Sequence, residues 1–354
     1  MEKVGQLKHK NPSKITKQRK RNRVIFFVIL VLSLLAIVNG VFKFVEFSDY
    51  VAKPLDLSGK KDSESQWNGD RIITIAVDSD PAIVVVFDPA TSRVGVISLP
   101  RDTYAVVPAD LGLYPVYSIR ELGELKGVAS GELLENTLSN FINAPVERYL
   151  FFPKAEVGLG TESAEIVARV RSAFSLKNLI LAPFMVKRNE LVTNLSWAET
   201  LKLWWFGRGV RSDKFEHYDL SKNGVISEII LADGTKAYGA DEIGVADFTR
   251  KVFTEDKILK EKLKIEILNG TDSPGRGNKI ANILDNVGCD VVRVGNYTGE
   301  RVEKTQISFN KESEGSLTTE RLEDILNVTG KRDDFEGRDV DITIILGQDI
   351  LKRF

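Results

Sequence analysis

The sequence has almost no residues of the types that build disulfides and zinc sites. Its 354 residues include one cysteine, Cys289, and two histidines, His9 and His217. One cysteine forms no intramolecular disulfide, and three such residues do not provide the ligand spacing of a zinc site or a cysteine–histidine catalytic pair. A serine-hydrolase elbow, a metalloprotease motif, a dinucleotide-binding glycine pattern and a Walker loop are also missing.

A net charge of −1 hides an uneven distribution of charge along the chain. Residues 1–23 carry nine Lys or Arg and one acid, whereas the rest of the chain carries 40 basic and 49 acidic residues. A basic tail is typical of nucleic-acid-binding arms, but the acidic remainder would repel phosphates. We therefore expect no nucleic-acid partner.

The segment after the basic tail, residues 24–42, contains no charge and is almost wholly apolar. As a helix it would span about 28 Å, close to the roughly 30 Å of a bilayer's hydrocarbon core. This predicts a single transmembrane helix in the cell membrane, with residues 1–23 cytoplasmic and the C-terminus extracellular. A cleaved signal peptide is the alternative, because small residues surround Asn39; the long basic region and full spanning length favour an uncleaved anchor.

Beyond a polar linker at residues 43–70, the pattern is that of an α/β protein in two parts. The first domain is predicted at residues 71–255. It begins with three apolar runs that predict buried strands, at residues 72–77, 83–87 and 94–99. Amphipathic helices and a hairpin are predicted to follow. A charged helix at residues 248–262 joins it to a smaller strand-helix-strand α/β domain at residues 263–349.

The sharpest local motif in the first domain is ISLPRDT at residues 97–103, just past a predicted buried strand. Sites of open α/β sheets gather at such strand ends. With Asp78, Asp80 and the Asp88-Pro89 turn, this motif resembles the LytR-CpsA-Psr (LCP) family of bacterial membrane-anchored cell-envelope proteins. The resemblance covers roughly residues 72–255.

The LCP family implies transfer of a phosphoglycosyl group from a polyprenyl-diphosphate carrier to the cell wall. By this resemblance, Asp78, Asp80, Arg101 and Asp102 are the catalytic candidates, and Asp78 and Asp80 would hold Mg²⁺ or Mn²⁺. An apolar groove would take the prenyl chain. The sequence departs from the family by lacking an arginine-containing loop between its two aspartates, and its later Arg-x-Arg segment is missing or reduced to residues 169–171.

The same residues allow a structural interpretation. An Arg-Asp pair after a strand is often a capped turn with its own ion pair, and closely spaced aspartates often shape a turn. Trp197, Trp204 and Trp205, at helical spacing, fit either a hydrophobic core or a surface for lipid or glycan.

Residues 263–349 resemble the LytR C-terminal domain over nearly its full length. The similarity lies in LNGT after the first strand, VGN after the second, and the closing LGQD. No established chemistry accompanies this domain. Asn269, Gly270, Thr271 and Ser273 stand between a strand and a helix N-terminus, where they would either bind an anionic ligand or form a turn and an N-cap.

Together these features predict a membrane-anchored, extracytoplasmic cell-envelope protein with a binding or assembly role in wall glycopolymer biology and with transferase activity reduced or lost. Its partners would be the membrane, a polyprenyl-phosphate lipid or wall glycopolymer, and other envelope proteins. The alternative is an active divalent-cation-dependent phosphotransferase that attaches polyprenyl-diphosphate-linked glycopolymers to the cell wall. Transcriptional control would require DNA binding by the 23-residue tail alone.

Overall fold

The computed structural model describes residues 66–222, 224–333 and 339–354. The predicted tail at residues 1–23, the predicted transmembrane segment at 24–42 and most of the linker at 43–70 lie outside them. Among the described helices, none has the length and apolar character needed to cross a bilayer.

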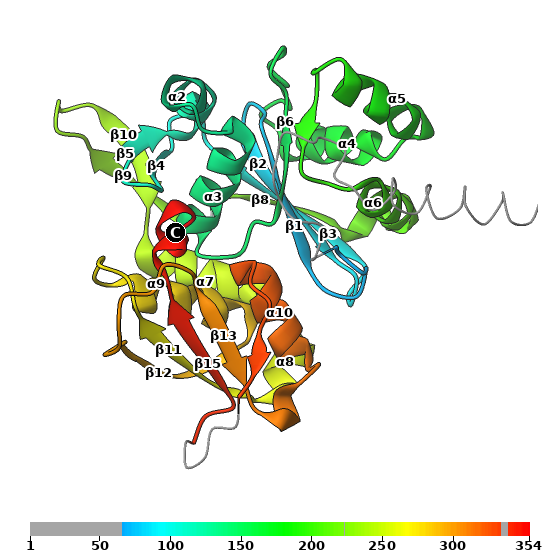
Figure 1. The fold of residues 1–354 in the computed structure, drawn as a ribbon. Coiled ribbons are helices and arrows are strands. Elements are labelled where there is room, and N and C mark those ends of the chain that lie inside the picture. The colour runs from blue at the N-terminus through cyan, green and yellow to red at the C-terminus, as the bar shows by residue number, and fades with distance from the viewer. Residues whose placement is uncertain (1–65, 223, 334–338) are drawn as a thin grey trace, which may run out of the picture. The chain divides into compact units, whose positions relative to one another are not determined.

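The first half of the described chain is built on a six-stranded mixed sheet (Figure 1). From edge to edge its strands are β7 (Val192–Thr193), β6 (Arg148–Phe151), β1 (Ile73–Val77), β2 (Ala82–Asp88), β3 (Arg93–Leu99) and β8 (Phe215–Asp219). The central strands β1, β2 and β3 form an antiparallel meander, and β6 and β8 pair in parallel with its two outer members. The three apolar runs of the sequence are therefore the centre of the sheet, as predicted.

Both faces of this sheet are covered, which explains why β1 to β3 read as continuous apolar runs. Ala76, Val84 and Ile97 face a hydrophobic cluster that includes α3 (Ser130–Ile142) and α7 (Glu242–Phe253). The neighbouring residues of each strand face a second cluster with α4 (Ser163–Ala173) and α6 (Trp197–Gly209). Figure 1 shows α3 on one side of the sheet and α4 and α6 on the other.

The remaining elements of this half lie around the sheet. They are the hairpin strands β4 (Tyr104–Val107) and β5 (Gly112–Pro115), the helices α2 (Ile119–Lys126) and α5 (Leu176–Lys187), and the hairpin strands β9 (Ile226–Ile230) and β10 (Lys236–Ala240). The predicted helix at residues 248–262 is instead two helices, α7 and α8 (Asp256–Glu261). The chain turns at Glu255. Its N–H does not donate to a carbonyl of the preceding helix but to Val287 O, at 2.9 Å.

The second half is a separate five-stranded sheet with its own core. Its strands run β12 (Asp290–Asn296), β11 (Lys264–Asn269), β15 (Ile342–Leu346), β13 (Gln306–Phe309) and β14 (Lys331–Arg332) from edge to edge. The helices α9 (Arg276–Val287) and α10 (Leu317–Leu326) contribute buried Ile280, Leu284, Leu322 and Ile325 to that core. The α/β class is therefore confirmed for both halves of the described chain.

Candidate functional site

Two carboxylates at the C-terminal end of β1 each meet an arginine from elsewhere in the chain. Arg120 Nη2, in α2, lies 2.5 Å from Asp78 Oδ2. Arg101 forms an ion pair with Asp80, and its Nη1 also lies 3.3 Å from Glu156 Oε1. Of the four residues predicted as catalytic, three thus come together, joined by Arg120 and Glu156. We call Asp78, Asp80, Arg101, Arg120 and Glu156 the charged cluster.

β6 and the segment that follows it fix the backbone of both aspartates. Asp78 N donates to Leu150 O at 2.9 Å, and Asp78 Oδ2 accepts from Phe152 N at 3.4 Å. Asp80 N donates to Val157 O at 2.9 Å, and Leu159 N donates to Asp80 O at 2.8 Å. The backbone of residues 150–159 therefore holds both aspartates in place.

Each arginine of the cluster also lies over an aromatic ring. Arg101 Cζ is 5.3 Å from the centroid of Tyr117, and Arg120 Cζ is 5.4 Å from the centroid of Phe151. Cation–π contacts of this kind hold a guanidinium in place while leaving some of its N–H groups available. The arginines are thus oriented by both a carboxylate and a ring.

The electrostatic balance of the cluster is slightly acidic, with three carboxylates and two guanidinium groups. Burial raises the pKa of Asp78 above its ordinary value, although the charge of Arg120 and its hydrogen bond act in the opposite direction. Hydrogen bonding to Asp80 raises the pKa of Arg101, which stays fully charged. A phosphorylated ligand would therefore meet arginines already neutralised by carboxylates.

Asp102, the fourth predicted residue, lies apart from this arrangement. Its side chain is exposed, and its backbone carbonyl accepts from Tyr238 N in β10 at 3.1 Å. The next residue, Thr103, is buried and donates its N–H to Pro100 O. Asp102 therefore belongs to a turn that leads into the hairpin.

The donors near Asp78 and Asp80 do not fit the Mg²⁺ or Mn²⁺ that the family resemblance implies. Divalent cations of this type need several oxygen ligands, and here each aspartate is engaged by an arginine. In residues 66–222, 224–333 and 339–354, no group of three or more His, Cys, Asp or Glu side chains is placed to hold a metal.

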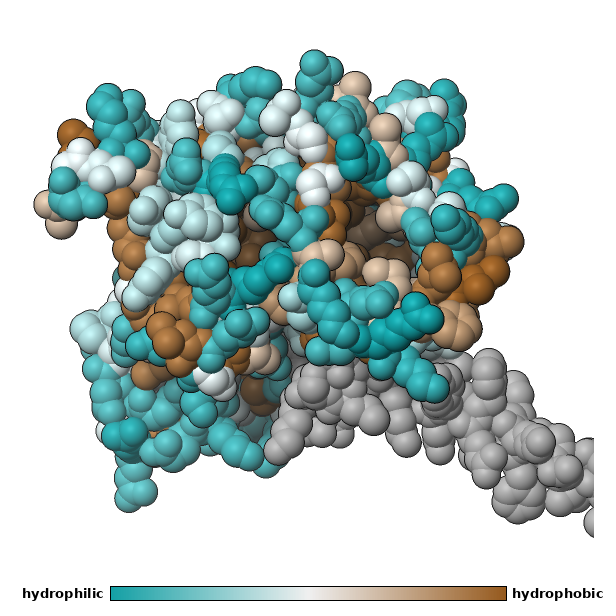
Figure 2. Space-filling view, turned by 90° about the horizontal axis from the view of Figure 1, so that it is seen from above, coloured by the Kyte–Doolittle hydropathy of each residue, from teal (hydrophilic) through white to brown (hydrophobic). Residues whose placement is uncertain are grey.

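An apolar cavity of about 480 Å³ lies in the same half of the chain as the charged cluster. It lies between one face of the first sheet and the helices α4, α5 and α6, and its walls are almost entirely aliphatic and aromatic side chains. Figure 2, which looks onto this face, shows a hollow lined by hydrophobic side chains. The lining includes Val77, Phe152 and Val157, so the segments that hold Asp78 and Asp80 also form a wall of the cavity.

Arg169 places a guanidinium at this cavity. It is one of the lining residues, and its Nη1 donates to Gly158 O at 3.1 Å while Nη2 lies 2.9 Å from Glu165 Oε1. Gly158 is the bridge partner of Asp80. Arg171, the other arginine of the predicted Arg-x-Arg remnant, instead lies over the ring of Phe215.

The serine of the ISLPRDT motif has a structural role. Ser98 is buried, and its Oγ lies 2.8 Å from His217 Nε2 in the neighbouring strand β8. The other ring nitrogen, Nδ1, lies 2.8 Å from Ser163 Oγ at the start of α4. Because serine hydroxyls engage both ring nitrogens and Ser98 is buried, this pair joins β3, β8 and α4 and does not have the arrangement of a nucleophile with a carboxylate-oriented base.

The three tryptophans of α6 do not share one environment, whether that of a hydrophobic core or that of a surface for lipid or glycan. Trp204 lines the cavity, and Arg208 Cζ lies 5.4 Å from its ring centroid. Trp205 is 75% exposed, and Trp197 is partly buried.

In the C-terminal half, the loop predicted to bind an anion uses its polar groups internally. Asn269 Oδ1 accepts from Thr271 N at 3.1 Å and from Thr271 Oγ1 at 2.8 Å, and Asn269 Nδ2 donates to Ser273 O at 3.0 Å. Ser273 Oγ accepts from Arg276 at 3.0 Å. Gly270 lies so close to Leu346 O that a Cβ would approach it to 2.7 Å. The geometry supports the turn interpretation of Asn269, Gly270, Thr271 and Ser273.

The closing LGQD motif is explained by packing. Gly347 lies against the backbone of Lys304, where a Cβ would come within 2.4 Å of a carbonyl carbon. Asp349 then accepts from both the N–H and the hydroxyl of Thr305, at 2.9 and 2.7 Å. The motif therefore fastens the end of β15 to the start of β13.

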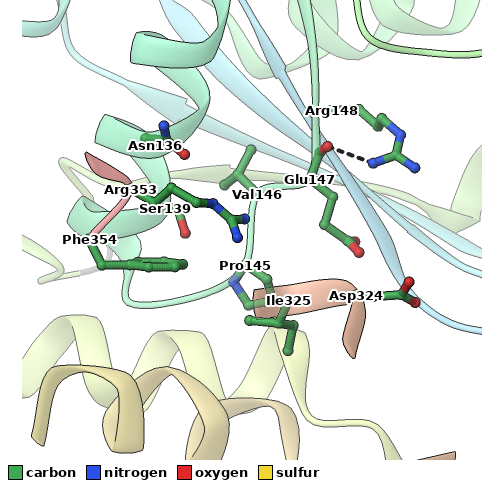
Figure 3. Close-up of a pocket in the computed structure, with 10 residues that line it drawn as sticks. All are labelled: Asn136, Ser139, Pro145, Val146, Glu147, Arg148, Asp324, Ile325, Arg353 and Phe354. Carbon is green, nitrogen blue, oxygen red and sulfur yellow. Dashed lines mark hydrogen bonds between the residues drawn. The ribbon is translucent and has the colours of Figure 1, made fainter. Parts of the chain in front are cut away.

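A small cavity of about 10 Å³ lies between the two halves (Figure 3). Its lining combines α3, the segment before β6, α10 and the last two residues, Arg353 and Phe354. A space of this size holds no more than a water molecule. Buried charges surround it, among them Glu147 and Asp324, and these join the halves rather than bind a ligand.

The sequence predicts an apolar groove but neither its position nor the part of Arg120 and Glu156 in the charged cluster. Arg120 is separated from Asp78 by 42 residues, and only tertiary packing brings the two together. The cavity depends on α5, whose apolar sequence gives no amphipathic pattern and was not predicted as an element.

Comparison with known proteins gives both structural and sequence similarities. B. subtilis TagV is similar at 15% identity, covering 52% of this chain and 96% of that chain, with a TM-score of 0.38. A transcriptional regulator from Enterococcus faecalis is similar at 11% identity, covering 53% and 89%, with a TM-score of 0.39. TagT bound to LIIa-WTA is similar at 13% identity, covering 56% and 94%, with a TM-score of 0.35. No curated protein matches the chain.

A family model described as LytR cell envelope-related transcriptional attenuator matches residues 262–349. This range contains the whole second sheet together with α9 and α10. The resemblance deduced from LNGT, VGN and LGQD is confirmed by this match. Residues 262–349 are therefore a LytR C-terminal domain.

Proposed function

We propose that this chain is a membrane-anchored, extracytoplasmic cell-envelope protein of LCP type that binds a polyprenyl-phosphate lipid or the wall glycopolymer it carries. Its role is binding or assembly, with transferase activity reduced or lost. One observation carries the proposal: the segments that hold Asp78 and Asp80 of the charged cluster also form a wall of an apolar cavity of about 480 Å³. In a ligand with an anionic head and a hydrocarbon tail, the head would match the arginines and the tail would match the cavity.

The cavity suits the tail of such a ligand. Its volume falls within the range of about 300–1,000 Å³ typical of small-molecule sites. Burial of hydrocarbon stabilises a complex by about 25 cal/mol per Å² removed from water. The walls, including Ile75, Leu179 and Leu203, offer aliphatic contacts along most of this space.

The arginines suit the head. Guanidinium groups bind phosphate oxygens through paired N–H donors, and Arg101 and Arg120 are already held over aromatic rings. Binding would require these arginines to exchange part of their contact with Asp80 and Asp78 for contact with phosphate. Arg169, at the cavity wall, is a further guanidinium, and Gly158, to which it donates, is the bridge partner of Asp80.

The engagement of both aspartates favours binding over metal-dependent transfer. Each carboxylate is neutralised by an arginine, so neither is free to take part in a cation site. The alternative, a divalent-cation-dependent phosphotransferase, draws support from the convergence of Asp78, Asp80 and Arg101. Asp102 does not share in that convergence.

The experiment is native mass spectrometry of the full chain in detergent, incubated with a polyprenyl diphosphate and with or without Mg²⁺ or Mn²⁺. The variants are Arg101→Ala and Arg120→Ala, and the control is Arg211→Ala, an 81% exposed arginine paired only with neighbouring Asp213 among its described contacts. Bound, intact lipid that both variants lose and the control keeps supports the proposal. Metal-dependent cleavage would establish the transferase instead, and no binding by the unmodified chain would contradict both.

The anchor and its orientation are part of the same proposal. The apolar segment at residues 24–42 and the basic tail at residues 1–23 would place the described domains outside the cytoplasm. Protease added to intact cells should then digest the C-terminal domain and leave an N-terminal tag untouched. Other envelope proteins are candidate partners of the LytR C-terminal domain.

A further inference from the structure

Helix α5 is apolar on two opposite faces. One face lines the cavity, and the other is exposed. Asn178, Leu179, Ala182 and Met185 line the cavity. Leu176, Ile180 and Phe184 follow each other at intervals of four residues and therefore lie on one helix face. Their side chains are 53%, 56% and 56% exposed. We call these three residues the outer stripe.

No residue of α5 is fully buried, which is unusual for a helix of such composition. A helix in contact with water normally turns polar residues outward. Here the helix forms a wall one helix thick, with cavity on one side and an exposed row of large apolar side chains on the other. In Figure 2, hydrophobic side chains gather at the edge of the molecule beside the hollow, where Figure 1 places α5.

The stretch of sequence that contains the outer stripe is basic in an otherwise acidic molecule. Residues 176–214 carry seven Lys or Arg and three Asp or Glu, while the chain from residue 24 onward has nine more acidic than basic residues. One of the three acids, Glu199, is buried and paired with Arg148. Lys177 and Lys187, both exposed, stand at the two ends of α5. An apolar stripe bounded by lysines matches a lipid interface with anionic headgroups.

The path of the chain points to the same surface. The described residues begin at Gln66, and Trp67 is buried against α6, where its N–H donates to Glu199 Oε1 at 3.0 Å and its carbonyl accepts from Lys202 Nζ at 2.9 Å. Helix α6 packs against α5 and carries the 75% exposed Trp205. The chain that leads from the apolar segment at residues 24–42 thus enters the fold on the helix next to α5.

We propose that the outer stripe of α5 is a second membrane contact, which lies in the headgroup region of the bilayer that holds the anchor. This inference rests on the proposed anchoring and goes beyond it. It sets the cavity one helix away from the acyl chains, so that a lipid tail enters the cavity from the membrane without crossing water. The occupant is the lipid interface, not a second protein.

Single cysteines in the full chain test this placement. Ile180→Cys and Phe184→Cys are labelled with an environment-sensitive fluorophore, and Leu125→Cys in α2, 80% exposed in the unmodified protein, is the matched control. The native Cys289 is buried, so it does not compete for the label. The labelled chains are reconstituted into phosphatidylcholine vesicles with and without phosphatidylglycerol, and quenching by lipids with a nitroxide in the acyl chain is measured.

We expect several-fold stronger quenching at positions 180 and 184 than at 125, and stronger quenching with phosphatidylglycerol. Equal, weak quenching at all three positions would overturn the proposal. A blue shift at 180 and 184 without quenching by lipid would identify a protein surface as the occupant and would also overturn it. The vesicles contain no prenyl lipid, so carrier binding does not affect the result, and flotation of the chain with the vesicles reports the anchor separately.

Discussion

Arg321 in α10 lies 2.7 Å from Glu147, the residue before β6, and this ion pair joins the LytR C-terminal domain to the first half of the described chain. Arg321 is 1% exposed and also lies 2.9 Å from Glu255. Arg71 reaches the same Glu147 oxygen at 2.7 Å. The two α/β parts therefore meet through buried, paired charge as well as through apolar contact.

Removal of one partner from this pair should destabilise the protein strongly. We expect Arg321→Met to lower the free energy of unfolding by about 3–5 kcal/mol, because it leaves Glu147 and Glu255 buried without their shared cation. The measurement is urea unfolding of residues 66–354, which contain all three hydrophobic clusters. Arg301→Met, at an exposed arginine of the same domain, is the control and should change stability by less than about 1 kcal/mol. A similar small effect for both variants would refute the assigned role of Arg321.

The same pair should make stability depend on acid pH. Burial alone would raise the pKa of Glu147, but Arg321, Arg71 and Arg148 outweigh it and hold the pKa at about 2. Because the folded pKa lies below the unfolded value, this contribution is present above about pH 4.5 and is lost as the pH falls toward 2. At Glu255 and Asp324 burial also raises the pKa, and there the neighbouring arginines do not outweigh it.

Glu147→Gln isolates this contribution. The stability advantage of the unmodified protein over Glu147→Gln should be largest near pH 6 and should shrink steadily below pH 4.5. Denaturant unfolding at a series of pH values measures the difference, to which Glu255 and Asp324 also contribute because the charge of Glu147 raises their pKa values. A difference that does not vary between pH 6 and 3 would show that Glu147 is not held ionised by its arginines.

Filling the cavity should abolish lipid binding without unfolding the protein. Ala182 lines the cavity from α5, and Ala182→Phe would occupy space needed by a prenyl chain. We expect at least a tenfold loss of polyprenyl-diphosphate binding, while the free energy of unfolding changes by about 1 kcal/mol or less because the site is open. Ala232→Phe, at an exposed residue of the second hairpin, should keep full binding. Unchanged binding by Ala182→Phe would place the lipid elsewhere.

His217 should give a second pH dependence, nearer neutrality. Burial lowers the pKa of His217 below its ordinary value of 6.5, and its two nitrogens are engaged by Ser98 and Ser163. A lowered folded pKa means that its contribution is present above pH 6.5 and declines as the pH falls below that value. Melting temperatures from pH 8 to 5 should fall for the unmodified protein more than for His217→Gln. Parallel profiles would contradict this.

The sequence was most informative where periodicity is strong. The apolar runs around Ile75, Val85 and Val96 read as buried strands because both faces of their sheet are covered, and α9 shows its core face directly through Ile280 and Leu284. Helix α5 could not be predicted in this way. Its inward and outward faces are both apolar, so no 3.6-residue pattern emerges.

Only those residues of the candidate site that local sequence selects could be predicted. Asp78, Asp80 and Arg101 stand at strand ends, where α/β sites gather, and local sequence is enough to select them. Arg120 and Glu156 join them only through tertiary packing, because α2 and the segment after β6 meet at the end of β1. The engagement of each aspartate by an arginine, on which the proposed binding role depends, is a property of that packing.

The central claim is that the charged cluster and the apolar cavity form one site for a prenyl-phosphate lipid. Photo-cross-linking tests it most directly, with the full chain and a polyprenyl diphosphate that carries a diazirine in its tail. Tandem mass spectrometry should find the label in peptides from residues 150–159 and from α5, with loss of labelling in Arg120→Ala. Labelling confined to the LytR C-terminal domain, or equal labelling in Arg120→Ala, would contradict the account.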